Sequence, residues 1–451
     1  MAEWIDIFDL LLPPFYFIAI YLIALLIKNR KLRIQGNDHY IYFIPALLCK
    51  MIGGISLCLI YTFYYKIGGD VTNYFLTAQT FVNVLFDGNF SLFFDMLDFH
   101  NNNIHLTGIL SKDYGQIHFR HTDYYALFTT VLCIPTIIIG CKSFIASTMV
   151  LSFISFLGLW KLYEVFVFHF PQMIKQFAIA IFFIPSVFFW GSGLLKDTYA
   201  IFSIGIYTYS VFKFVIQKNR NLKYLLLLLT SSLLLIFIKP YILAALMPGS
   251  LIWINFNRIQ NIKSPILKTL SIPLLLIILI ASIGAAFTFL GKYLGDYSLD
   301  NVLDKAVKTQ KDLVREQYGT NFYDIGSFDP SMAGILSKAP AAINMALFRP
   351  YLWNASNPVM LLSGLENLFT LGFTIFIIIR IKFKALFKSL FSHPLLVFSL
   401  LFSLFFAFSV GLTTANYGAL VRLKIPLVPF YISALFMLYE FNLKGRNDSR
   451  F

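Results

Sequence analysis

Long apolar runs alternate with short polar segments along most of the chain. Runs of about 18 residues or more can cross the roughly 30 Å hydrocarbon layer of a bilayer. Backbone polar groups in lipid must bond internally, so these runs predict helices. The pattern predicts an all-α polytopic membrane protein with about 11–13 transmembrane helices. The runs lie at 8–28, 40–65, 124–140, 143–166, 174–191, 198–217, 223–240, 241–256, 268–290, 359–381, 393–412 and 421–441.

Basic residues gather between these runs and predict an orientation. The clusters lie at 28–33, 218–223, 258–268, 380–388 and 444–450. Cytoplasmic loops are rich in Lys and Arg, so segments 66–123 and 291–358 are expected on the outer face. This orientation requires an odd number of crossings, whereas the runs above are even in number. We assign the discrepancy to the short runs between 124 and 175 or to the region around Pro240.

The composition excludes several classes of protein. The chain has 451 residues, 58% of them hydrophobic and 13% charged, with a net charge of +14. The cations lie in clusters between apolar runs, which argues against the continuous basic face of a nucleic-acid-binding protein. The four cysteines lie in or beside apolar runs, a placement typical of buried apolar residues. The sequence contains neither a P-loop nor a G-x-G-x-x-G motif, which argues against a nucleotide-driven pump.

The pattern predicts four regions. Residues 1–39 form an extra N-terminal span with a basic cytoplasmic loop, and 40–290 form the membrane core, which includes the external loop 66–123. In that loop, apolar residues at helical spacing predict one or two helices lying in the membrane interface. A second external loop, 291–358, contains an amphipathic helix at 298–319. Residues 359–451 form the last spans and a basic tail.

The stretch YYKIGGDVTNYFLTAQTF, residues 64–81, places Asp70 directly after the second apolar run. One interpretation is an N-cap, because Asp follows two glycines and precedes a helical pattern. The other is a carboxylate at the membrane surface that deprotonates an acceptor hydroxyl during attack on a lipid-phosphate-linked sugar. The two interpretations are compatible.

This stretch resembles the first external loop of the GT-C superfamily of integral-membrane glycosyltransferases, which take sugars from polyprenyl-phosphate carriers. The family's acid, aromatic, small residue and glycine fall on Asp70, Tyr74, Ala78 and Gly88. HTDYYALFTTVLCIPTIIIG and PSVFFWGSGLLKDTYAIFSIGIYTY are similar to later family segments, so the resemblance covers about residues 40–220. Three features depart from the family: Val71 replaces a second acid, Thr122 and Asp123 replace two prolines, and a helix precedes residue 40. The resemblance implies a catalytic role for Asp70 and a substrate contact for Tyr74.

The segment DYGQIHFRHTDYY, residues 113–125, concentrates polar side chains in the same loop. Asp113 and Asp123 are alternatives for a second catalytic carboxylate facing Asp70, and Arg120 is a candidate phosphate contact. His118 and His121 are candidate substrate contacts. Together with a carboxylate they are also an alternative divalent-metal site, although their spacing is not a standard ligand signature. We therefore assign no metal ligand and no cofactor.

Cations near the outer face could compensate the charge of a phosphate leaving group. The candidates are Lys196, Lys239, Arg349 and Arg422, and the alternative role for each is snorkelling to lipid headgroups. Arg422 lies in a helix that begins at Gly418 and is followed by Pro426 and Pro429, which predicts an interrupted helix with free N–H groups. Glu366 lies inside an apolar span, where an acid faces a partner or a cavity; Arg349 and Arg422 are candidate partners.

These features predict a membrane glycosyltransferase or polysaccharide polymerase that uses a polyprenyl-(di)phosphate donor at the outer face of the cytoplasmic membrane. Two alternatives stay open: a transporter or flippase of a lipid-linked saccharide, and a non-catalytic subunit of an envelope assembly. The expected partners are the lipid-linked sugar, membrane lipids and other glycan-assembly proteins, and not nucleic acid.

Overall fold

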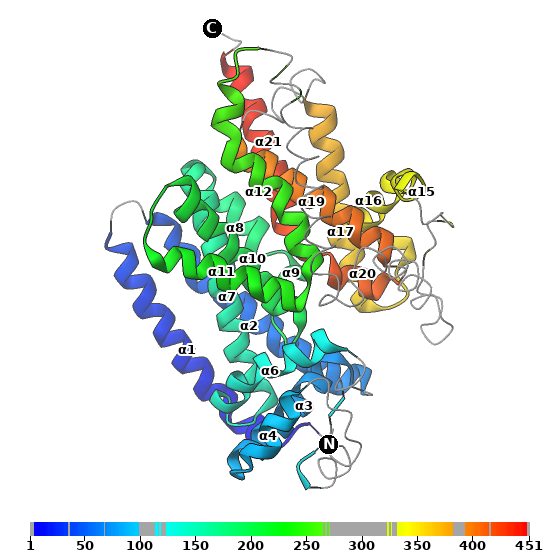
Figure 1. Cartoon of the computed structure of the whole chain (residues 1–451). Helices are drawn as coiled ribbons and strands as arrows, with labels where there is room; N and C mark the ends of the chain where they lie inside the picture. The colour runs from blue at the N-terminus through cyan, green and yellow to red at the C-terminus, as the bar shows by residue number, and fades with distance from the viewer. Residues whose placement is uncertain are drawn as a thin grey trace. The chain divides into compact units, whose positions relative to one another are not determined.

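The computed structural model describes residues 4–34, 37–66, 68–98, 113–115, 117–118, 123–264, 267, 270, 323, 326, 332–381, 393–414 and 416–448. The described elements are helices (Figure 1). They form two compact units. Unit 1 comprises residues 1–174, 187–212 and 220–240, and unit 2 comprises 175–186, 213–219 and 241–451. The four regions predicted from the loops stay a prediction.

Unit 1 is a bundle in which α10 packs against α7 and α11, α2 packs against α7, and α3 packs against α6. Phe43, Phe156 and Trp160 are buried together between α2 and α7. Its helices are α1 (Phe8–Leu32), α2 (Phe43–Leu59), α3 (Asp70–Phe86), α4 (Phe90–Leu97), α6 (Tyr124–Ile139), α7 (Phe144–His169), most of α9 (Pro185–Trp190), α10 (Lys196–Ser210) and α11 (Leu222–Ile238).

Unit 2 is built around α19, which packs against α16 and α21. The close approach of α19 to α16 requires glycine at position 411. A Cβ atom added there would lie 1.9 Å from the carbonyl oxygen of Ala342. Its helices are most of α8 (Ile174–Phe182), α12 (Pro240–Gln260), α15 (Met332–Ser337), α16 (Ala339–Phe348), α17 (Pro358–Arg380), α19 (Pro394–Thr413), α20 (Tyr417–Leu423) and α21 (Val428–Asp448).

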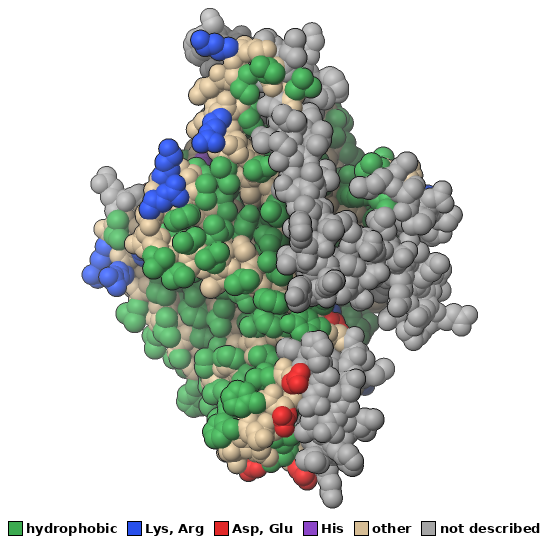
Figure 2. All heavy atoms as spheres, viewed as in Figure 1, with side chains coloured by type: hydrophobic (Ala, Val, Ile, Leu, Met, Phe, Trp, Pro, Cys, Tyr) green, Lys and Arg blue, Asp and Glu red, His purple; other side chains and the backbone are tan. Residues whose placement is uncertain are grey.

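Seven described helical segments are long and apolar enough to cross a membrane, and an eighth is obtained if the bent pair α20–α21 is one span. This confirms the polytopic all-α class. Figure 2 shows the corresponding surface, where hydrophobic side chains cover most of the visible described atoms and carboxylates gather at the α3–α4 end of unit 1. The seven segments are Phe8–Leu32, Asp38–Tyr65, Phe144–His169, Lys196–Ile216, Pro240–Gln260, Pro358–Arg380 and Pro394–Thr413.

The remaining predicted runs have different outcomes. The run 174–191 is not one helix, because it is divided into α8 and α9, which are nine and six residues long. The break precedes Pro185, whose ring disfavours helical geometry in the residue before it. The runs at 124–140 and 223–240 form the shorter apolar helices α6 and α11. The run 268–290, apart from residue 270, and the amphipathic helix at 298–319 lie outside the described residues, so the total number of spans stays a prediction.

The predicted helical pattern in the segment 66–123 corresponds to two helices, α3 and α4. They are separated by Gly88, whose φ of 76° is accessible to glycine at little cost. The Asn89 side chain then caps α4 by accepting a hydrogen bond from the Leu92 N–H at 3.2 Å. The placement of these two helices in the membrane interface stays a prediction.

The crossing of α7 and α10 provides a test of helix packing. A Cβ atom added at Gly205 of α10 would lie 2.0 Å from the carbonyl oxygen of Gly158 in α7. We expect Gly205→Ala to separate the helices and lower the free energy of unfolding by about 1–3 kcal/mol, as overpacking does. Gly372→Ala in α17, where nothing lies within 4 Å, is the control and should stabilise by about 0.5–1 kcal/mol. Unfolding in mixed micelles measures the free energy of unfolding of both variants. Equal changes in the two variants would contradict the packing argument.

Candidate functional site

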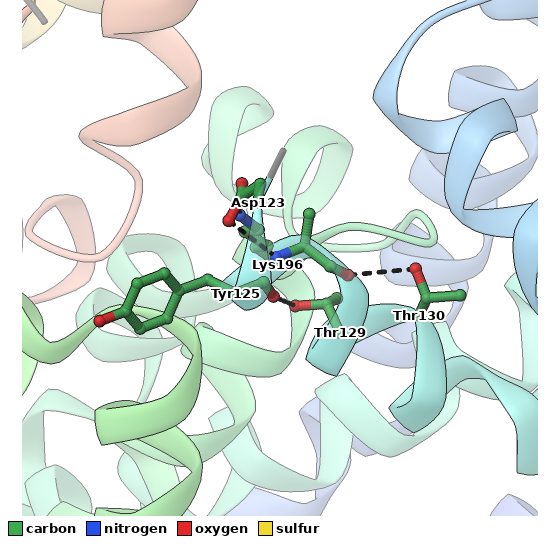
Figure 3. A network of polar contacts seen from close by, with 6 residues as sticks. Asp123, Tyr125, Thr129, Thr130 and Lys196 are labelled. Atoms are coloured by element: carbon green, nitrogen blue, oxygen red, sulfur yellow. Dashed lines mark hydrogen bonds and ion pairs between the residues drawn. The ribbon is translucent and has the colours of Figure 1, made fainter. Parts of the chain in front are cut away.

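Asp123 connects the start of α6 to the start of α10. It is the N-cap residue of α6, and its Oδ1 accepts a hydrogen bond from the Ala126 N–H at 3.1 Å. Its Oδ2 lies 2.6 Å from Lys196 Nζ, with which it forms an ion pair. Figure 3 shows Lys196 directed at this carboxylate above the first turns of α6. One side chain therefore fixes the helix start and the position of the cation.

Asp70 and a second ion pair lie in the same charged cluster. Asp70 is the first residue of α3, is half-buried and interacts electrostatically with Lys196. Lys239, directly after α11, also interacts with Lys196 and forms a buried ion pair with Asp197. We call Asp70, Asp123, Lys196, Asp197 and Lys239 the carboxylate–lysine cluster.

Three helices begin at the carboxylate–lysine cluster. Asp70 begins α3, Asp123 caps α6, and Lys196 and Asp197 form the first turn of α10. Each helix start carries partial positive charge, which favours carboxylates in the first turn. Asp70 is not the N-cap of α3, because Gly69 occupies that position and Thr72 Oγ1 accepts the Gly69 N–H at 2.8 Å. The capping interpretation of Asp70 is therefore wrong.

The turn before α10 is held by buried polar groups. Lys50 of α2 is fully buried, and its Nζ donates to the carbonyl oxygens of Gly191 and Val187. From α7, Ser155 Oγ donates to Gly191 O at 2.9 Å and Ser152 Oγ to Ser192 O at 2.7 Å. These bonds fix the segment from which Lys196 and Asp197 project. Sequence reasoning missed Lys50, although a lysine inside the apolar run 40–65 was a signal for it.

The other residues predicted in the first loop lie apart from one another. Tyr74 is buried on α3, one turn after Asp70. The His118 backbone N–H donates to Thr77 Oγ1 at 3.2 Å, and burial lowers the pKa of its imidazole, which favours the neutral form. Asp113 is exposed and lies beside Asn83 and Asp87 at the far end of α3, so Asp123 is the carboxylate that joins Asp70. Arg120 and His121 lie outside the described residues.

Unit 2 contains Arg349, which was predicted as a phosphate ligand. Its Nη1 donates to the Tyr417 hydroxyl at 3.2 Å, and its guanidinium lies 4.9 Å from the centre of the Tyr351 ring. Arg349 is thus surrounded by tyrosines in this unit. Its carbonyl oxygen accepts a hydrogen bond from Lys424 Nζ at 3.1 Å.

Glu366 does not form a described ion pair with Arg349 or Arg422. Its carboxylate accepts hydrogen bonds from the Ser186 N–H at 2.8 Å and the Ser186 hydroxyl at 2.6 Å, and the cation that interacts with it is Lys424. A small space of about 10 Å³, about the room that one water molecule needs, lies beside Glu366 and Lys424, and a substrate path at Glu366 stays a prediction. Lys424, which donates to Asn367 Oδ1 at 2.5 Å, was missed from the sequence.

The predicted interruption near Arg422 exists, because α20 and α21 meet at an angle of 67°. The place of Arg422 in it differs from the expectation. Arg422 lies in the last turn of α20, where unpaired carbonyl groups give partial negative charge, and not at a helix start. This helix therefore does not provide free N–H groups for an anion site beside Arg422.

The described residues contain no group of three or more His, Cys, Asp or Glu side chains that could hold a metal ion. His121, one of the two histidines considered for such a site, lies outside them. A search for related proteins matches no family model, no curated protein and no solved structure. The functional argument therefore depends on the geometry of the carboxylate–lysine cluster.

Two substitutions separate the roles of Asp123. Asparagine is as good an N-cap as aspartate, so Asp123→Asn should keep the α6 cap and lose only the charge opposite Lys196. Asp123→Ala loses both, and should lower the free energy of unfolding by about 1 kcal/mol more than Asp123→Asn. Urea unfolding in mixed micelles measures the difference. Identical values for the two variants would show that the cap contributes nothing.

Proposed function

We propose that the protein is a membrane glycosyltransferase or polysaccharide polymerase that takes its sugar from a polyprenyl-(di)phosphate carrier at the outer face of the cytoplasmic membrane. The observation that carries the proposal is that carboxylates from two separate helices act on one cation: Asp123 forms an ion pair with Lys196, and Asp70 interacts electrostatically with the same lysine. A base and a phosphate-neutralising cation are the groups that glycosyl transfer from a lipid phosphate requires.

The roles follow from the contacts and from the resemblance. Asp123 is held by Lys196 and by the α6 cap, so we assign it the role of positioning the lysine. We assign the role of the base to Asp70, the position that matches the family's acid in the resemblance to GT-C glycosyltransferases. Asp70 removes the proton from the acceptor hydroxyl as its oxygen bonds to the anomeric carbon. The bond between that carbon and the phosphate oxygen breaks, and the lipid (di)phosphate leaves with the electron pair. Lys196 stabilises the charge on this leaving group, while Lys239 stays paired with Asp197.

The charge distribution of unit 1 supports an outer location for the α3 side. α1 has Asp9 in its first turn and Arg30 and Lys31 in its last. Trp4 Nε1 donates to Thr62 Oγ1 at 3.1 Å, and Asp9 Oδ1 accepts the Ser143 hydroxyl at 2.6 Å. The segment that leads from α2 to α3 therefore lies at the acidic end of α1, and so does the turn between α6 and α7. The positive-inside rule assigns that end to the outer face. The proposed protein has about 11–13 spans.

A transporter of a lipid-linked saccharide is the second candidate, and one observation in unit 2 favours it. The apolar helix pair α20–α21 is broken at residues 424–427, where Lys424 is buried. Interrupted helices with charged residues at the break are typical of secondary transporters. The first candidate accounts for more of unit 1, because transport does not require paired carboxylates at a surface loop.

The test compares the glycans and lipid-linked precursors of cells with and without the chain. Loss of a glycan, with the precursor accumulating in the outer leaflet where an added impermeant glycosidase digests it, is the expected result. Accumulation in the inner leaflet would contradict transfer and favour the transporter. Unchanged glycans and precursors would contradict both.

A further inference from the structure

A second polar site lies at the far end of α3 from Asp70. It is an open depression of about 460 Å³ formed by the last turn of α3, the α6–α7 turn and the short segment at 113–114. Because it is open to solvent, a ligand here would lie against the surface and not be enclosed. The residues that line it are Asn83, Phe86, Asp87, Asp113, Tyr114 and Lys142.

Hydrogen bonds between the lining residues hold this depression in shape. Asn83 Nδ2 donates to Tyr114 O at 3.0 Å, and Lys142 Nζ donates to Asn83 Oδ1 at 2.8 Å. The Tyr114 hydroxyl donates to Asp87 Oδ2 at 2.6 Å, and this bond raises the pKa of Tyr114. The phenol therefore keeps its proton, and the bond to Asp87 persists, to a higher pH than a free tyrosine would allow.

The chemistry of the lining limits the ligand. Carboxylates, an amide, a phenol and an ammonium place acceptors and donors within one depression. Phe86 is 62% exposed, and Lys142 Nζ lies 5.1 Å from the centre of its ring. Two carboxylates against one lysine disfavour a phosphate group, and the polar lining disfavours an acyl chain. We propose that this depression binds a saccharide, whose hydroxyls meet the polar groups while a ring face packs on Phe86 or Tyr114.

Its position suggests the role of that saccharide. The lining residues of α3 and its C-cap, Asn83 to Asp87, lie about 20–25 Å along the helix from Asp70 at 1.5 Å per residue. A saccharide of several units bound here could extend along α3 toward Asp70. The depression would then be a remote acceptor subsite, a role that rests on the proposed function. Saccharide binding itself does not depend on catalysis.

Saturation-transfer NMR on the full chain tests the binding. The protein is held in a zwitterionic detergent without a sugar headgroup, and the probes are maltotriose, cellotriose and chitotriose. We expect transfer to at least one trisaccharide, and a Kd about 10-fold weaker in Asp113→Ala, an exposed position whose substitution should not disturb folding. Asp95→Ala, an exposed carboxylate of α4 outside the depression, is the matched control and should bind like the native chain.

Two results would overturn the proposal: no transfer to any of the three probes, or equal weakening by Asp113→Ala and Asp95→Ala. The same titration on Asp70→Asn separates it from the proposed function. Asp70→Asn should bind the trisaccharides like the native chain, whether or not the proposed function holds. If Asp70→Asn also keeps native glycan formation in cells, the proposed catalytic function fails while the binding site stands.

Discussion

Asp70→Asn is expected to reduce glycan formation by about 10²–10⁴-fold, the range that a positioned general base contributes. The amide keeps the size and shape of the side chain but cannot accept the proton of an acceptor hydroxyl. Folding should change little, because Thr72 and Gly69 form the cap of α3 without Asp70. The loss of a carboxylate from the first turn costs about 0.3–1 kcal/mol. The measurement is glycan yield per amount of folded protein in the membrane.

Asp95→Asn is the matched control for this substitution, because it removes one carboxylate from α4, outside the carboxylate–lysine cluster. Normal yield in Asp95→Asn and loss in Asp70→Asn, at equal thermal unfolding temperature, is the pattern expected for a lost base. Normal yield in both variants would remove Asp70 from the mechanism. Loss of yield together with a large drop in unfolding temperature would show that Asp70 acts through folding instead.

The elements that depend on local pattern were predictable from the sequence. The apolar runs at 8–28 and 393–412 correspond to α1 and α19, since length and hydropathy alone identify such helices. The two loop helices α3 and α4 followed from helical spacing interrupted by DGN, where Gly88 adopts a positive φ. The prediction of one helix over 174–191 is wrong, because hydropathy does not reveal a helix break before a proline inside an apolar stretch.

The partners within the site were not predictable, because they depend on contacts between distant segments. Lys196 and Asp123 are 73 residues apart, and Lys50 and Gly191 are 141 apart. Sequence pattern identified Lys196 and Lys239 as cations near a helix end but could not separate snorkelling from pairing. In unit 2 it selected Arg422 and missed Lys424, which is the residue buried at the break. Gly418, Pro426 and Pro429 predict an interruption, but they do not show which cation is buried at it.

The buried pair of Lys239 and Asp197 should give the largest effect on stability. The side chains are 6% and 0% exposed, so neither charge can be solvated when its partner is removed. Removing one partner of a buried pair costs about 3–5 kcal/mol, whereas replacing both with apolar residues is often close to neutral. We therefore expect Asp197→Leu to lower the free energy of unfolding by about 3–5 kcal/mol, and the double variant Asp197→Leu/Lys239→Met to recover most of that loss.

Lys161→Met is the control, because Lys161 is partly exposed on α7 and lies 2.7 Å from Glu164, which would keep its hydrogen bond from the Tyr40 hydroxyl at 2.8 Å. Breaking an exposed pair changes the free energy of unfolding by about 0–1 kcal/mol. Equal effects of Asp197→Leu and Lys161→Met would contradict a desolvated pair at residues 197 and 239. A double variant as unstable as Asp197→Leu alone would show that Asp197 is held by groups other than Lys239. Recovery of stability without recovery of glycan formation would assign the pair a role beyond folding, because Lys239 interacts with Lys196.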